Sequence, residues 1–151
     1  MKCGGHCCDE AHPPISQTCE QRLLAAGVPV TAFETTGYRR LRVNPDNTCI
    51  LMKEGMCKIH AIKPETCRAG PFTFDVNGDM IRLFLKHESI CPIVSLLKEV
   101  PEAYEQQYDL AVKNLTNLVA HLTDVEIDAI NRIEEPETDL VAEIPRGHRY
   151  V

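Results

Sequence analysis

Cysteine is the residue type in this chain that most clearly predicts chemistry. Eight of the 151 residues are cysteine: Cys3, Cys7, Cys8, Cys19, Cys49, Cys57, Cys67 and Cys91. The last 60 residues contain none. In a reducing compartment thiols stay unpaired, so clustered cysteines there are typical of metal or redox ligands. We therefore take all eight as candidate metal ligands.

The densest group is the run Cys3-Gly4-Gly5-His6-Cys7-Cys8. Its two glycines allow the backbone to fold tightly around an ion or cluster, where a Cβ atom would clash. Adjacent cysteines rarely pair with each other, because the small ring strains both the disulfide and the peptide. The run therefore predicts ligands to one metal centre or to two neighbouring ones, with His6 as an alternative ligand.

A second group is Cys49-x7-Cys57-x9-Cys67, and Cys91 follows further along, directly before Pro92. A strand carrying Cys57 and a helical turn carrying Cys67 can bring both sulfurs to one end of a sheet. Cys19 falls within an expected helix, where core burial and metal ligation both fit.

Three further residues lie within the second group or directly after Cys67. Arg68 and Lys63 can offset the charge of thiolates, and His60 can donate a hydrogen bond to one. We predict no catalytic residues.

Zinc and iron–sulfur clusters both accept four sulfur ligands. A four-thiolate site would keep a net charge of about −2 with either Zn²⁺ or a [4Fe–4S]²⁺ core. Structural zinc sites use short paired spacings, and only Cys3-x3-Cys7 has one. Long irregular spacings with a vicinal pair favour a cluster. We expect [4Fe–4S], in one or two copies, with Zn²⁺ as the alternative.

The elements that must hold these cysteines predict a small, metal-stabilised α+β domain. We expect a β-rich region over residues 1–91, a helical region packed on it over residues 92–133, and an extended tail over residues 134–151. In the first region the sequence predicts a helix from Ser16 or Thr18 to Ala26 and strands at 38–43, 48–52 and 56–59. It also predicts a helical turn after Pro64 and a β-hairpin in which residues 72–76 pair with 81–85 across a turn at Asn77-Gly78.

Apolar residues in the second region recur at intervals of three and four from Ile93 to Leu122, which predicts one stripe on a helix. The stripe comprises Ile93, Leu97, Val100, Tyr104, Tyr108, Ala111, Leu115, Leu118 and Leu122. Pro101 is expected to divide it into two helices. Thr123 and Glu126 form the pattern of a capping box that opens another helix.

Composition excludes several classes of function. Sixteen basic against 22 acidic residues give a net charge of −6, whereas nucleic-acid binding needs concentrated Lys and Arg. No apolar stretch approaches the roughly 18 residues of a membrane span. The N-terminus has no charged-then-apolar signal peptide, so we expect a cytoplasmic protein.

Two segments resemble the YkgJ-like cysteine-cluster family of zinc- or iron-chelating domains. The run Cys3-Gly-Gly-His-Cys7-Cys8 resembles the N-terminal motif of the family. The second block of the family is similar to Cys49-Ile-Leu-Met-Lys-Glu-Gly55-Met-Cys57-Lys-Ile59-His60-Ala-Ile-Lys63-Pro64-Glu-Thr-Cys67-Arg68, with Gly70-Pro71-Phe72 following. Members often carry a further cysteine before the first one here, so Cys19, Cys91 or His6 would replace that ligand.

The resemblance covers residues 3–72, with Cys91 as the counterpart of a later family cysteine, and it implies metal chelation. Some larger relatives are protein lysine methylases, notably of flagellin, but no glycine-rich cofactor loop occurs here.

Three hypotheses for the function follow from these patterns. The first is an accessory or redox- and oxygen-responsive protein whose helical half or C-terminal tail binds a protein partner. The alternatives are an iron–sulfur-dependent enzyme, including the lysine methylase type, and a module stapled by zinc.

Overall fold

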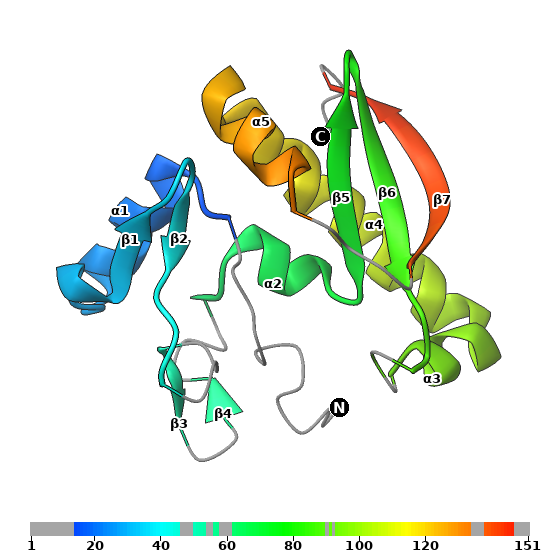
Figure 1. Cartoon of the computed structure of the whole chain (residues 1–151). Coiled ribbons are helices and arrows are strands. Elements are labelled where there is room, and N and C mark those ends of the chain that lie inside the picture. Colours follow the sequence, from blue (N-terminus) through cyan, green and yellow to red (C-terminus); the bar gives the residue numbers. More distant parts are fainter. Residues whose placement is uncertain are drawn as a thin grey trace.

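The computed structural model describes residues 14–45, 50–53, 56–57, 62–89, 91, 93–133 and 138–146. The chain is an α+β protein, as the sequence predicts, with short hairpins early and helices later (Figure 1). In chain order its elements are α1 (Gln17–Ala25), the 3₁₀ turn η2 (Val30–Ala32), β1 (Phe33–Thr35), β2 (Arg39–Leu41), β3 (Met52–Lys53), β4 (Met56–Cys57), α2 (Glu65–Ala69), β5 (Phe72–Asn77), β6 (Met80–Lys86), α3 (Ile93–Glu99), α4 (Pro101–Ala120), α5 (Asp124–Asn131) and β7 (Thr138–Pro145).

The N-terminal unit is α1 with the β1–β2 hairpin. Ser16 caps α1, and its hydroxyl accepts a hydrogen bond from the backbone N–H of Cys19 at 3.1 Å. Gly27 follows the helix with a φ of +101°, as the C-terminal signal predicts. These elements enclose a small apolar core, whose buried members are Ile15, Cys19, Leu23, Val28, Ala32, Phe33, Leu41 and Leu51.

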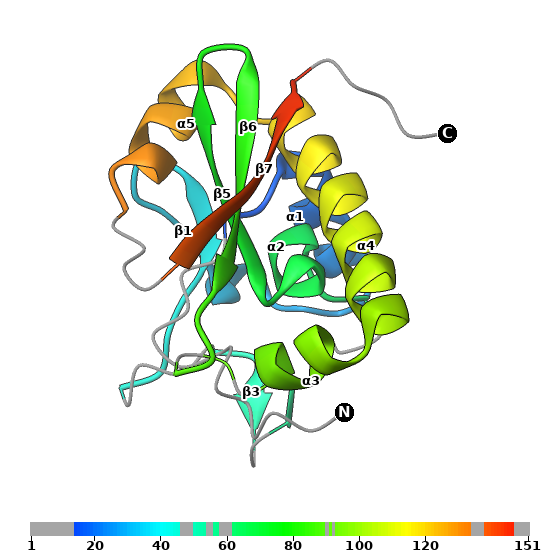
Figure 2. The same ribbon diagram turned by 90° about the vertical axis from the view of Figure 1, so that its right-hand side faces the viewer.

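The larger core lies between a three-stranded antiparallel sheet and the helices (Figure 2). Alternate residues of the β5–β6 hairpin face it: Phe72, Phe74 and Val76 on β5, and Ile81, Leu83 and Leu85 on β6. The hairpin turns one residue later than expected, because Asn77 pairs with Met80 and leaves Gly78 and Asp79 in the turn. Gly78 there has the positive φ, +60°.

Strand β7 corrects the expectation of a tail over residues 134–151. Residues 138–145 pair antiparallel with β6 along its whole length, and Ile144 is buried in the core. The acidic side chains of this segment and Pro145 favoured a solvated tail. Charge and residue propensity report only local preference, and they do not show whether a partner strand is available. The open hydrogen-bonding edge of β6 supplies the partner that makes them a strand.

The helical pattern is largely confirmed. Pro101 separates α3 from α4 and stands at the first position of α4, where its missing N–H costs nothing. Thr123 and Glu126 form the expected capping box of α5. Within the stripe Leu97, Ala111, Leu115, Leu118 and Leu122 are buried. Val100 is 48% exposed, because it is the residue between two helices rather than part of a helical face.

The short helix α2 lies between the two cores (Figure 1). Ala69 belongs to the larger core, and the Thr66 hydroxyl donates to the carbonyl of Pro14 beside the smaller one, at 3.4 Å. Tyr38, from the β1–β2 hairpin, also enters the larger core. None of the described helices combines the length and apolarity needed to cross a membrane.

Candidate metal centre

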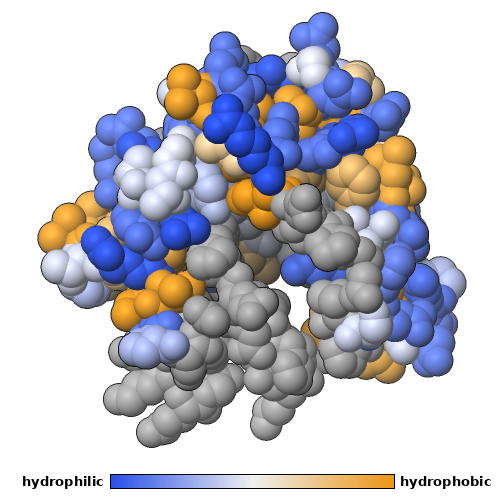
Figure 3. Space-filling model, viewed as in Figure 1, coloured by the Kyte–Doolittle hydropathy of each residue, from blue (hydrophilic) through white to orange (hydrophobic). Residues whose placement is uncertain are grey.

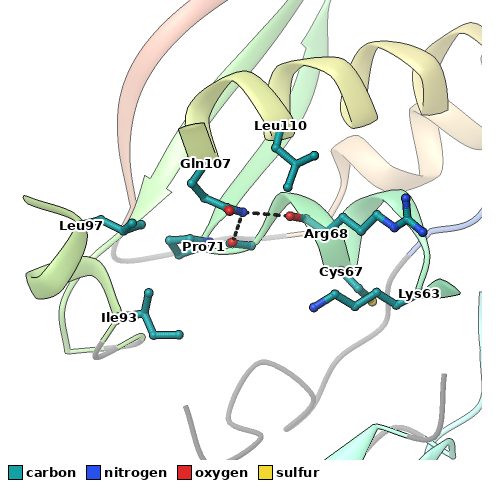
Figure 4. A pocket seen from close by; sticks show the side chains of 9 residues that line it. Lys63, Cys67, Arg68, Pro71, Ile93, Leu97, Gln107 and Leu110 are labelled. Carbon is teal, nitrogen blue, oxygen red and sulfur yellow. Dashed lines mark hydrogen bonds between the residues drawn. The ribbon is translucent and has the colours of Figure 1, made fainter. Parts of the chain in front are cut away.

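Helix α2 positions the candidate ligand Cys67. Pro64 precedes the helix and accepts a hydrogen bond from the N–H of Arg68 at 3.0 Å. Glu65 and Ala69, one turn apart, are 5% and 0% exposed and form the buried face. Cys67 is about 200° around the helix from Glu65. Its half-buried thiol therefore lies on the side of α2 opposite the buried face (Figure 4).

The thiol of Cys67 opens onto a pocket of about 250 Å³. The lining residues are Lys63, Cys67, Arg68, Gly70, Pro71, Ile93, Leu97, Gln107 and Leu110. Figure 4 shows the Lys63 ammonium on the same side of α2 as the thiol, whereas the Arg68 side chain extends away from Ile93 and Leu97. A metal-bound thiolate at Cys67 would therefore share its pocket with the cationic Lys63.

Cys91 is half-buried and packs against the larger core. It lies just before α3, where its carbonyl accepts from the N–H of Val94 at 3.1 Å and its own N–H donates to the carbonyl of His87 at 3.1 Å. Ile93 lines the pocket, and two residues of chain span at most about 7 Å. The backbone of Cys91 therefore lies close to a residue that lines the Cys67 pocket, although Cys91 is not itself a lining residue.

Cys19 has different surroundings. Its side chain is 1% exposed in the smaller core, and Arg22 Nη2 lies 3.5 Å from its sulfur. Burial, helped by the nearby charge of Glu65, raises the pKa of the Cys19 thiol from 9.0 to about 12. The neutral thiol is therefore favoured, which suits a core residue and opposes metal binding. The sequence left open whether Cys19 is a core residue or a metal ligand, and this geometry favours the core residue.

The remaining candidates lie outside the part of the chain that the structure describes. These are Cys3, Cys7, Cys8 and Cys49, together with His6 and His60. For Cys57 the structure describes the backbone, which pairs with Met52 in the β3–β4 hairpin. Within the described ranges no three His, Cys, Asp or Glu side chains converge closely enough to hold an ion. Cys67 and Cys91 fit a sulfur-ligated metal in chemistry, and a complete site needs more ligands.

Two residues of α4 that sequence reasoning missed contact α2. Gln107 Nε2 donates to the carbonyls of Arg68 and Gly70, at 2.9 and 2.7 Å (Figure 4). Asn117 Nδ2 lies 3.5 Å from Glu65 Oε1. No local pattern reveals such residues, because their partners are about 40 or more positions away in the sequence.

These features define a class of small α+β protein in which a helical layer supports a cysteine-bearing pocket. Residues 1–92 match the family described as a "Putative zinc- or iron-chelating domain" of the CxxCxxCC type, and the chain belongs to this family. No curated protein matches the chain, and neither does any solved structure.

Proposed function

We propose that this protein binds a sulfur-ligated metal centre at the Cys67 pocket. The ligands would come from Cys67 and Cys91 in the described part of the chain and from Cys3, Cys7, Cys8, Cys49 and Cys57 elsewhere. The observation that carries the proposal is the position of the half-buried Cys67 in a pocket that Lys63 also lines, with Cys91 two residues before the lining residue Ile93. Cys19, held neutral in the smaller core, is left out of the set.

An iron–sulfur cluster is the favoured centre, with Zn²⁺ as the alternative. The long spacings between cysteines support the cluster.

The test is anaerobic purification followed by a count of iron, zinc and acid-labile sulfide per chain. We expect iron with matching sulfide in the wild-type protein, and its loss in Cys67→Ser and Cys91→Ser. Cys19→Ser is the matched control and should keep the wild-type content. Equal metal in Cys67→Ser, Cys91→Ser and wild type would refute the assignment of these ligands. A zinc count without sulfide would replace the cluster by zinc.

We propose further that the centre serves a protein partner rather than a reaction of its own. Three exposed apolar side chains on or between α3 and α4 support this: Leu96 on α3 is 50% exposed, Val100 between the helices is 48% exposed, and Leu110, which lines the pocket, is 41% exposed. Apolar side chains are exposed elsewhere too, as Leu140 (52%) and Val141 (36%) are on β7, and Figure 3 shows apolar groups between hydrophilic ones on the face that it draws. Exposed apolar side chains on the helices that contribute to the pocket are suited to a partner that senses or uses the metal.

The partner role is tested with Val100→Lys. Tagged protein at its natural level should co-purify a defined partner that Val100→Lys loses. Val125→Lys is the control, because Val125 is 71% exposed on α5, away from the pocket-lining helices α3 and the start of α4. Recovery of the same proteins with both variants, or of none with wild type, would contradict this role.

A further inference from the structure

We propose that Gln107 is a positioning residue for the metal ligand Cys67. Gln107 lies on α4, beyond the 92 residues that match the chelating family. The inference rests on the proposed metal centre and assigns to the helical half a direct part in holding it.

The side-chain amide of Gln107 holds the end of α2. One nitrogen, Nε2, donates both to the carbonyl of Arg68, the residue after Cys67, and to that of Gly70. The last carbonyls of a helix have no partners within the helix. In α2, which has five residues, such carbonyls make up most of the backbone. Gln107 therefore replaces hydrogen bonds that the helix cannot supply to itself.

Helix α4 also contacts the other end of α2. There the Asn117 amide lies near the Glu65 carboxylate, one and a half turns before Gly70. The other Glu65 oxygen, Oε2, has no hydrogen-bond partner among the described residues. The two donors of α4 lie ten residues apart and bracket the turn that carries Cys67. The hydrogen bonds of Gln107 are shorter than the contact of Asn117, so Gln107 holds α2 more strongly.

The consequence concerns the mobility of a ligand. A helix of five residues is not stable alone, because nucleation is costly and few hydrogen bonds repay it. Without Gln107 the turn around Cys67 would sample other conformations, and each loosening would move the thiolate from the metal. Partners that orient metal ligands typically change metal affinity by about 10–100-fold. The role assigned to Gln107 is to hold the backbone of α2, because both hydrogen bonds of its Nε2 go to backbone oxygens.

The experiment measures the rate at which the purified metal-loaded protein releases its metal to EDTA. Gln107→Met keeps the length of the side chain and removes the donor. We expect release about ten times faster than from wild type. Gln107→Lys restores an N–H donor of similar reach and should recover part of the difference. Asn114→Ala is the matched control on the same helix, since Asn114 donates to the carbonyl of Leu110 within α4, at 2.8 Å.

A general loss of stability must be separated from loss of positioning. Asn131→Ala removes hydrogen bonds to β5, remote from α2, and serves as a destabilised control. It should lower the melting temperature and leave the release rate unchanged. Equal metal-release rates from Gln107→Met and wild type would overturn this inference and leave the proposed metal centre standing. The same holds if Asn131→Ala, with a melting temperature equal to that of Gln107→Met, also releases metal faster than wild type. Metal binding unaffected by Cys67→Ser overturns the proposed centre and the inference with it.

Discussion

The thiol of Cys19 lies against the carboxylate of Glu65 between α1 and α2, with both side chains at least 95% buried. Glu65 begins the helix that carries Cys67, so two cysteines on opposite sides of α2 have contrasting environments. Cys19 is enclosed and neutral, whereas Cys67 is half-exposed beside an ammonium group. The same residue type therefore serves the core on one side and the candidate metal centre on the other.

The Cys19 environment predicts a loss of stability at alkaline pH. The folded pKa of about 12 exceeds the ordinary value of 9.0, so folding favours the protonated thiol. That contribution is complete below pH 9 and is lost as pH rises from 9 toward 12. We expect the free energy of unfolding to fall by about 1–2 kcal/mol more in wild type than in Cys19→Ala between pH 9 and about 10.5. Urea denaturation at both pH values measures it. Parallel pH dependence in the two proteins would contradict the assignment.

Gly37 allows the β1–β2 hairpin to pack against α5. Its φ is +87°, and a Cβ atom there would lie 2.8 Å from the Cβ of Ala129. Gly37→Ala should therefore lower the free energy of unfolding by about 2–3 kcal/mol, from backbone strain and steric overlap together. Thermal or urea denaturation checks this.

Gly27→Ala is the control for Gly37→Ala, because Gly27 has a φ of +101° but no atom within 4 Å of its added Cβ. It should show the strain component only, about 1 kcal/mol. Adding Ala129→Gly to Gly37→Ala should recover the steric part. If the two glycine variants lose equal stability, the overlap with Ala129 is not significant.

Asn131 completes the hydrogen bonding at the free edge of β5. Its Oδ1 accepts from the N–H of Val76 at 3.0 Å, and its Nδ2 donates to the carbonyl of Val76 at 2.8 Å. The side chain thus takes the place of a neighbouring strand and covers an edge that would otherwise be open to other chains. Asn131→Ala should cost about 1–2 kcal/mol of unfolding free energy, measured by urea denaturation. A neutral result would mean that water replaces both bonds without loss.

Removal of the metal should affect the two cores unequally. The larger core is built mainly from apolar residues of β5, β6, β7, α4 and α5, although the proposed ligand Cys91 packs against it. After chelation we expect faster amide hydrogen exchange in residues 62–71, which include α2, and little change in β6 and α4. Mass spectrometry of exchanged peptides provides the measurement. Loss of protection throughout the chain would instead indicate that the metal staples the whole fold, as in zinc modules.

Features that depend on neighbouring residues were predictable from sequence. The Ser16 cap, the Thr123–Glu126 capping box, the division of the helices at Pro101 and the glycine in the β5–β6 turn all use partners within a few positions. The cysteine spacing likewise identified the chelating family. The physical reason is that backbone geometry and short-range hydrogen bonds are determined by residues within a few positions of each other.

Features that depend on distant partners needed the tertiary structure. Residues 138–145 are a strand because β6 offers an edge, and Gln107 matters because packing puts it beside the carbonyls of α2. The sequence determined that this protein is thiol-rich, α+β and of the metal-chelating family. Only the tertiary structure distinguished Cys19 from Cys67, because burial and neighbouring charge, which set whether a thiol stays protonated, arise from segments far apart in the chain.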